Sequence, residues 1–459
     1  MEKKDYCMLF VFGLFLILFA IFTTKISFPD SPEYITAAKN LAGINNIDMF
    51  TGHSLLYPYI ISLFLRIWPN LIIIKLVNTL WIFLIGLILL VWLKNRNAFL
   101  IFAFSPLTWF VSVMTIPALP AGFFLFLSFL LFKKKFKYNL IYSGIFFGLS
   151  FAFYDPILLF GLFFVLIYFW NRNLSEVIVY LTGIFVGTIP RLILDYHLFK
   201  MPLYTFIRYA GANLILTIGL NPNSQWEFLR SPQVFLIFIA ISPFLFRLYK
   251  LDFKKYCKLF IFLGLITIIL IFRTGGLWYF ILISPIIVVL LSKTLSKKEI
   301  LMHSIISIGL IIILTGSFFG INSDSLSAGS FFGINSDSLV KNDIEKIIKE
   351  FDTSYIIGGP FESIWFSIFS WENKPYFVWY QDYEASLDNR TTIREYNYSF
   401  DSRIPLKDRL RFSASFDRFD PNKIYDDYIL VTAKKQDEFP DLSNFTLNKC
   451  YEILCVYEK

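Results

Sequence analysis

The residue with the clearest potential for chemistry is Asp30, a carboxylate that follows directly after the first long hydrophobic segment of the chain. The residues after it predict a short helix on the membrane surface, since Ser31 can cap it, Pro32 suits its first turn and Gly43 can end it. A carboxylate held at the mouth of this helix is one of the side chains that can transfer a proton in an active site. The plainer alternative is a surface acid that only caps the helix.

Cations that could recognise a phosphate group are the second feature. The outward candidates are Arg191, Arg208 and Arg273, and a guanidinium group pairs bidentately with phosphate oxygens. Arg273 is the strongest, because it ends an apolar segment and precedes residues 275–279 (GGLWY), where backbone and rings could approach a lipid headgroup. Its alternative role is an interfacial anchor that snorkels to the membrane surface. Weaker candidates are Lys25, Lys39, Lys75 and Lys200.

The chain that must position these residues has the amino-acid composition of a membrane protein. Of 459 residues, 56% are hydrophobic and 17% are charged, whereas soluble domains are about 25% charged. We therefore expect an α-helical polytopic membrane protein with about 11 spans. Hydrophobic runs lie near 6–24, 71–93, 98–113, 118–132, 139–153, 156–170, 176–194, 232–249, 258–272, 276–292 and 300–316. The three histidines and four cysteines lack metal-ligand spacing, so a multi-histidine centre is not expected.

Basic residues predict the topology of these spans. Residues 53–69 are a further apolar candidate, interrupted by His53, Pro58 and Arg66. If this segment lies in the interface, the basic clusters, including residues 133–135 (KKK), all fall on one side, as the positive-inside rule prefers. We therefore predict an uncleaved first span, a cytoplasmic N-terminus and a multi-pass protein of the cell membrane. Topology already accounts for the excess positive charge, so nucleic acid is not expected as a partner.

The C-terminal part, residues 341–459, is expected to form a small extracytoplasmic α/β domain. It is rich in acids and lacks a long apolar run, and β-type stretches occur near 355–357, 376–380, 428–432 and 451–457, with a helix from Asp343 to Phe351. Cys450 and Cys455 either pair there or stay free.

Between the two parts, residues 316–326 and 329–339 both have the sequence GSFFGINSDSL. This duplication indicates a linker over 317–340 that tolerates extra length. The membrane domain then spans 1–316, with a first outer loop at 25–70. In this topology Asp30, Glu33 and Asp155 face outward, where a reaction has no access to cytosolic ATP or nucleotide sugars. A donor that has already crossed the membrane on a lipid is the natural substrate.

Several short motifs support such a donor through their order along the chain. They are an acidic first-loop segment (28–43), a GHSLLYP segment (52–58), SPL (105–107), GIFFGL with YDP (144–149 and 154–156), IPR to MPL (189–203) and a late segment from Arg273 to Pro285. Over residues 1–300 this order resembles the GT-C superfamily of polyprenyl-phosphate-sugar-dependent glycosyltransferases, which includes protein O-mannosyltransferases and lipid A aminoarabinose transferases.

The resemblance implies an active site in a cavity at the outer leaflet. Asp30 would be the general base that deprotonates an acceptor hydroxyl, and the sugar would be transferred with inversion from a polyprenyl- or dolichyl-phosphate donor to a glycan, lipid or protein. Substrate-binding roles would fall to Glu33, Tyr34, His53, Asp155, Arg191, Arg208, Arg273 and Tyr279. Each of three has a structural alternative: Glu33 as a solvated helix acid, His53 as a ring packed on the first-loop helix, and Asp155 as part of an Asp-Pro turn.

The chain departs from the family pattern in residues 115–120 (TIPALP), which lack the second acid found in many relatives. No clear two-carboxylate metal site is therefore predicted, although a divalent metal stays open and no other cofactor is indicated. The departure leaves a single-base mechanism or a degenerate enzyme. Two further alternatives are a polysaccharide polymerase, ligase or flippase, and a non-catalytic receptor or assembly protein that works through its external domain.

Overall fold

The computed structural model describes most helices and strands of the chain. The described residues are 2–23, 31–44, 53–112, 114–134, 136–170, 173–207, 209–210, 243–269, 277–318, 334–351, 355–358, 366, 368–371, 376–379, 395–396, 412–413, 428–433 and 446–458. The chain divides into two compact units, one of Met1–Thr23, Lys75–Phe206 and Gly219–Gly316, and one of Thr24–Ile74, Ile207–Ile218 and Ser317–Lys459. The second unit thus joins the first outer loop to the C-terminal part, and the domain boundaries expected from the sequence stay a prediction.

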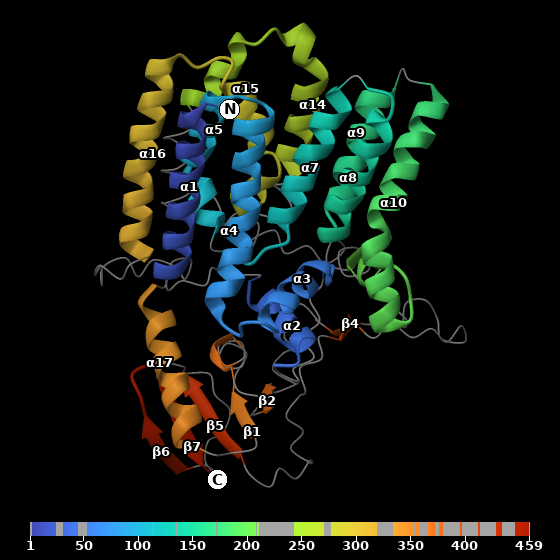
Figure 1. Cartoon of the computed structure of the whole chain (residues 1–459). Coiled ribbons are helices and arrows are strands. Elements are labelled where there is room, and N and C mark those ends of the chain that lie inside the picture. Colours follow the sequence, from blue (N-terminus) through green and yellow to red (C-terminus); the bar gives the residue numbers. More distant parts are fainter. Residues whose placement is uncertain are drawn as a thin grey trace. The chain divides into compact units, whose positions relative to one another are not determined.

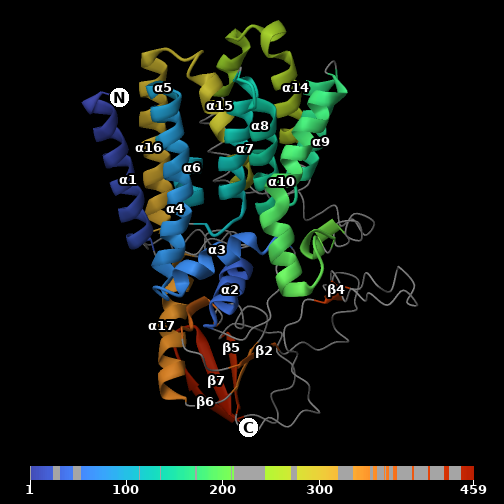
Figure 2. The ribbon, with the colours of Figure 1, turned by 45° about the vertical axis from the view of Figure 1, so that its right-hand side comes forward.

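The first unit is a bundle of apolar helices (Figures 1 and 2). Its elements are α1 (Lys3–Phe22), most of α4 (Leu71–Leu87), η1 (Ile88–Trp92), α5 (Arg96–Ala103), α6 (Pro106–Ser112), α7 (Ala118–Lys133), α8 (Asn139–Phe153), α9 (Ile157–Phe169), α10 (Leu174–Phe199), η2 (Arg247–Lys250), α14 (Phe253–Ile269), η4 (Leu277–Leu282), α15 (Ser284–Leu291) and α16 (Lys297–Phe318). Among the described helices, Lys3–Phe22, Leu71–Trp92 and Leu174–Phe199 are long and apolar enough to cross a membrane. The mostly helical membrane fold is confirmed, whereas the total of about 11 spans stays a prediction.

A proline divides one of the predicted apolar runs into two shorter helices. The run at 98–113 breaks between α5 and α6, where Pro106 is the first residue of α6, because proline suits a first turn but cannot continue a helix. The break frees backbone carbonyl groups, and side chains take them up: the Thr108 hydroxyl donates to the Phe102 carbonyl at 2.8 Å and the Trp109 indole to that of Ala103 at 2.7 Å. An apolar surrounding requires this compensation.

Helices α8 and α10 cross at unusually close range through four glycines. These are Gly144 and Gly148 on α8, and Gly183 and Gly187 on α10. A Cβ atom on any of them would lie 2.0–2.4 Å from a carbonyl oxygen of the facing helix. The Gly-x-x-x-Gly motif recognised in the sequence therefore serves backbone-to-backbone packing, with a matching pair on the partner helix.

The second unit contains three described helices and a five-stranded mixed sheet (Figure 1). The helices are α2 (Ser31–Ala42), α3 (Leu56–Leu65) and α17 (Ile334–Glu350). The sheet has the order β2-β1-β5-β7-β6, with β1 (Tyr355–Gly358) parallel to β2 (Tyr376–Trp379) and β5 (Tyr428–Ala433), and β7 (Leu454–Glu458) antiparallel to β5 and β6 (Thr446–Cys450). A short pair of β3 (Glu395–Tyr396) and β4 (Phe412–Ser413) accompanies it. The small C-terminal sheet is thus present.

Two details of this domain differ from the expectation. The stretch expected as one strand from Tyr451 to Tyr457 is a turn followed by β7, which begins at Leu454. Helix α17 begins at Ile334, inside the second copy of the repeat, well before the expected Asp343.

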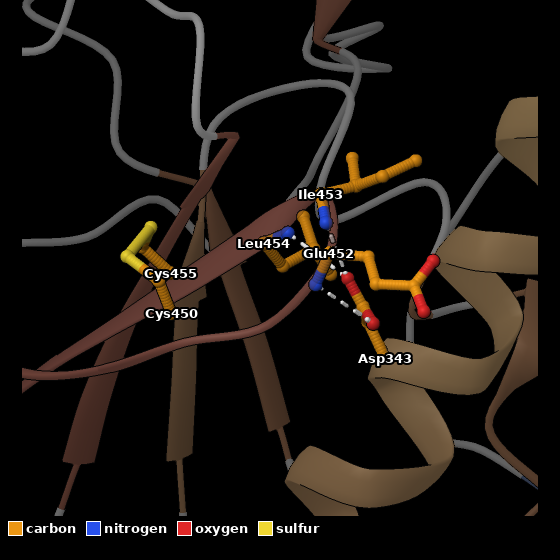
Figure 3. The surroundings of a disulfide bond; sticks show 6 residues. All are labelled: Asp343, Cys450, Glu452, Ile453, Leu454 and Cys455. Carbon is orange, nitrogen blue, oxygen red and sulfur yellow. Dashed lines mark hydrogen bonds between the residues drawn. A yellow bond between two sulfur atoms is a disulfide. The ribbon is translucent and has the colours of Figure 1, made fainter.

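Asp343 explains why the chain turns where it does (Figure 3). Its buried carboxylate accepts hydrogen bonds from three successive backbone N–H groups of residues 452–454, at 3.3, 2.7 and 3.1 Å. These donors would be unavailable in a straight strand. Cys450 and Cys455 face each other across the same hairpin and form a disulfide bond.

Candidate functional site

The predicted site residues fall into two groups with respect to the structure. Asp30, Arg208 and Arg273 lie outside the described residues, and of Glu33 only the backbone is described, in the first turn of α2. Asp30 immediately precedes Ser31, the first residue of α2. The other predicted residues, Tyr34, His53, Asp155, Arg191 and Tyr279, are described and belong to two separate clusters.

The first cluster consists of aromatic rings near the start of α2. The His53 ring lies 6.2 Å from the Tyr34 ring, stacked at 29°, and 4.8 Å from the Tyr209 ring. Tyr34 and Tyr57 are fully buried and their rings are 6.5 Å apart. His53 therefore packs against the first-loop helix, as one of its two interpretations expected. Its role toward a substrate stays a prediction.

This cluster packs against the first turn of α2, and its His53 ring stays partly accessible. Tyr57 belongs to α3, and burial raises the pKa of its hydroxyl above its usual range, so the group stays protonated and can donate a hydrogen bond. His53 is half-buried and keeps part of its imidazole accessible.

The C-terminal end of α2 is equally well defined. Gly43 has a φ of 77° and follows the last helical residue. Its N–H donates to the Asn40 carbonyl and that of Ile44 to the Lys39 carbonyl, both at 2.9 Å, the hydrogen bonds of a Schellman motif. The helix end predicted at Gly43 is confirmed.

The second cluster is a buried ion pair in the helical bundle. The Arg191 guanidinium on α10 lies 2.6 Å from the Asp155 carboxylate in the turn before α9, and neither side chain is exposed. Asp195, one helical turn further along α10, is 3.9 Å from the same guanidinium. Two predicted substrate ligands are thus brought together, and they bind each other.

Thr205 completes this ion pair. Its hydroxyl accepts hydrogen bonds from Arg191 at 3.1 and 2.8 Å and donates to the Asp195 carboxylate, and its backbone N–H donates to Asp195 at 3.1 Å. A fourth contact joins Arg191 to the Phe151 carbonyl at 3.4 Å. Most donors of the guanidinium fork therefore have acceptors within the protein.

Tyr279 contacts the same turn through Tyr154, the residue before Asp155. Its ring stacks on that of Tyr154 at 5.5 Å and 18°, and both residues are buried. Tyr154 directly precedes Asp155, so residues 154–156 form a point at which Arg191 and Tyr279 converge. The structure thus joins three of the eight predicted binding residues at one turn.

Sequence reasoning missed two members of this network for different reasons. Asp195 stands four residues after Arg191 on the same helix, a spacing that indicates an ion pair, so the signal was present. Thr205 carried no signal, since its position depends on the fold of the segment after α10. Lys75 on α4, one of the weaker phosphate candidates of the sequence, is buried and donates to the Thr23 carbonyl at the end of α1.

Within the described residues, no group of three or more histidine, cysteine, aspartate or glutamate side chains is placed to hold a metal ion. Asp30 lies outside the described residues, so a divalent metal beside it stays an open alternative of the sequence analysis.

Among known proteins, only the comparison with solved structures finds a match to this chain. No family model and no curated protein matches this chain. Among solved structures, ArnT from Cupriavidus metallidurans matches in its apo state with a TM-score of 0.65, and bound to undecaprenyl phosphate with a TM-score of 0.67. Each comparison covers 100% of this chain and 98% of the ArnT chain, at 10% sequence identity.

At this identity the likeness is one of fold. ArnT is a lipid A aminoarabinose transferase of the GT-C superfamily, the class that the order of sequence motifs resembles. The chain therefore has the fold of ArnT over the length compared, in agreement with the expected helical fold.

Proposed function

We propose that this protein is a membrane glycosyltransferase that moves a monosaccharide from a polyprenyl- or dolichyl-phosphate donor to an acceptor hydroxyl group. The observation that supports this most is the match of the full chain to ArnT in complex with undecaprenyl phosphate. The motif order of the sequence supports it independently, because it was recognised without the fold. The acceptor is a glycan, a lipid or a protein.

The proposed chemistry centres on Asp30. Its carboxylate takes the proton of the acceptor hydroxyl while the hydroxyl oxygen attacks the anomeric carbon of the sugar. The bond from that carbon to the phosphate oxygen breaks on the opposite face, so polyprenyl phosphate leaves and the configuration inverts. A positioned base of this kind contributes about 10²–10⁴-fold to a rate. The buried Ser31 and Tyr34 in the first turn of α2 support this role, because they fix the helix that follows Asp30 directly.

The proposed phosphate ligands are Arg273 and Arg208. Arg191 was a further candidate in the sequence, where Arg273 was the strongest, but the Arg191 guanidinium already bonds Asp155, Thr205 and the Phe151 carbonyl. We propose that this ion pair shapes the wall of the donor site and that Arg273 carries most of the phosphate recognition.

The remaining predicted ligands would act on the sugar. His53, half-buried between Tyr34 and Tyr209, is proposed to hydrogen-bond a sugar hydroxyl, with Glu33 orienting the acceptor. Tyr279 would present its ring edge from η4, where the ring stacks on Tyr154 beside Asp155. The site would face the extracytoplasmic side of the cell membrane, with the N-terminus in the cytoplasm and the C-terminal domain outside.

A release assay tests the proposal. The purified protein would be incubated with a panel of undecaprenyl-phosphate-linked monosaccharides together with glycan, lipid and protein acceptors, and free undecaprenyl phosphate would be measured. We expect release with one donor and a loss of at least about a hundredfold in Asp30→Asn, which keeps the size and capping ability of the side chain. Glu345→Gln, at an exposed acid of α17, is the matched control and should leave the rate unchanged, whereas Glu33→Gln should lower it much less than Asp30→Asn.

Binding separates the two parts of the proposal. Arg273→Ala should weaken binding of undecaprenyl phosphate about tenfold or more, while Asp30→Asn should bind it normally. Near-normal release by Asp30→Asn would overturn the base, and a wild-type protein that binds no polyprenyl phosphate would favour a receptor or assembly role.

A further inference from the structure

A single buried lysine joins the first-loop helix to the C-terminal domain. Lys39 lies near the end of α2 and has no exposed surface. Its ammonium group donates to the backbone carbonyls of Ile368 at 2.5 Å and Ser370 at 2.8 Å, and it lies 3.9 Å from the centre of the Trp371 ring. Both partners of this contact belong to the same compact unit.

The environment of Lys39 compensates an otherwise costly burial. Moving an ammonium group out of water is unfavourable unless it is hydrogen-bonded, and burial lowers the pKa of Lys39 well below 10.5. Two carbonyl dipoles and the face of an indole ring supply this compensation. The sequence suggested Lys39 as a weak phosphate candidate, whereas its donors here point at protein carbonyls.

Both sides of the contact are anchored in packed structure. On α2, Ile35 and Ala38 are fully buried, and the helix packs against α3. Arg66, at the end of α3, donates to the Leu41 carbonyl at 2.8 Å and so holds the last turn of α2.

The C-terminal side is anchored in the same way. Phe366, Ile368 and Phe369 are buried, and they belong to the connection between β1 and β2, two adjacent parallel strands of the sheet. A shift of α2 along its axis would therefore have to pull on the core of the C-terminal domain.

We propose that the C-terminal domain positions the proposed catalytic helix through Lys39, which makes Lys39 a positioning residue for Asp30. This inference rests on the proposed function for the role of Asp30, but not for the contact itself. Lys39 stands about 12 Å along the helix axis from Ser31, at about 1.5 Å per residue, so it acts through α2 and not on the substrate. A misplacement of about 1 Å at a reacting group can lower a rate about 10²-fold, so the hold on α2 matters for the base.

The test uses the purified full-length protein and two readouts. Lys39→Met keeps the length of the side chain but removes its charge and its N–H donors, and Lys39→Arg keeps both. Lys349→Met, which changes an exposed lysine on α17 of the same unit, is the matched control. Hydrogen exchange of the backbone amides of residues 31–42 reports on the contact without any need for activity.

We expect Lys39→Met to speed exchange in α2 at least about tenfold and to lower kcat about ten- to hundredfold. The KM for the donor should stay within about twofold of wild type, because a positioning residue does not bind substrate. Lys39→Arg should recover part of the exchange protection and of kcat, and Lys349→Met should change neither.

A second variant guards against a Lys39→Met protein that fails to fold. Trp371→Leu removes only the half-buried ring above the ammonium group, and it should shift both readouts in the same direction by less. Unchanged exchange of α2 in Trp371→Leu and Lys39→Met would overturn the contact. A raised KM with unchanged kcat would overturn positioning and make Lys39 a donor ligand. If the wild-type protein releases no lipid phosphate, the proposed function fails, while the exchange result still decides whether Lys39 holds α2.

Discussion

The Arg191 guanidinium and the Asp155 carboxylate lie 2.6 Å apart, and neither side chain is exposed. They come from α10 and from the turn before α9, and with Asp195 and Thr205 they form one hydrogen-bonded group. Two carboxylates share one guanidinium, so the group depends on that single cation. A buried pair of this kind is costly to break, because each partner leaves an uncompensated charge.

Breaking this pair from either side should therefore destabilise the helical bundle. We expect Arg191→Gln and Asp155→Asn each to lower the free energy of unfolding by about 3–5 kcal/mol, seen as a lower melting temperature of the purified protein. The double variant should lose less than the sum of the two, since both changes remove the same interaction. Strictly additive losses would show that the two side chains act independently.

The glycine crossing of α8 and α10 gives a second prediction. In Gly148→Ala and Gly187→Ala the new methyl group would lie 2.1 and 2.0 Å from a carbonyl oxygen of the facing helix, so the helices must separate. We expect each variant to lose at least about 1–3 kcal/mol in thermal unfolding. Gly264→Ala and Gly309→Ala are matched controls, because their new methyl groups meet nothing within 4 Å. Equal melting temperatures in all four variants would contradict the close crossing.

A third prediction concerns pH and the C-terminal hairpin. Hydrogen bonds from Lys449 at 2.5 Å and Tyr451 at 2.6 Å hold the pKa of Glu350 below its usual 4.5. A carboxyl group whose folded pKa is lowered stabilises the fold above its unfolded pKa and loses that contribution as pH falls through the folded value. Exchange protection of residues 446–458 should therefore decline below pH 4.5. Glu350→Gln should be less protected at pH 7 and show less of this decline; an identical pH profile would speak against the contact.

Topology can be tested by labelling single cysteines from outside the cell, after Cys7 and Cys257 are replaced. His197, Lys134 and Lys255 are exposed side chains, so a cysteine at each is accessible to a reagent on its own side. We expect an impermeant maleimide to label position 197 and to spare positions 134 and 255. Labelling of position 134 would mean that residues 53–69 cross the bilayer.

The sequence predicted those parts of the fold that depend on local pattern. Apolar length set most helices of the bundle, and β-branched and aromatic stretches located strands at Tyr355, Tyr376 and Tyr428. The turn after Cys450 was missed, because it depends on Asp343, 109 residues away from Glu452. Local pattern carries no information about such a partner.

The candidate site shows the same limit. Residue type and the predicted side of the membrane identified Asp155 and Arg191 as candidates. They did not predict that the two side chains bind each other. Lys39 was interpreted as a phosphate candidate from its positive charge alone. Its true acceptor, the Ile368 carbonyl, lies 329 residues further along the chain and could not be foreseen. A backbone carbonyl leaves no trace in side-chain composition, so only the folded chain could reveal this contact.

The duplicated segment has a consequence for how this gene can change. Helix α16 ends at Phe318, inside the first copy, and α17 begins at Ile334, inside the second. Because the copies are identical, an in-frame loss of residues 316–328 would leave one copy that still supplies both the end of α16 and the start of α17. Loss or gain of one copy therefore changes the length of this connection without altering a residue of either helix, so the connection tolerates changes in length that the helices themselves would not.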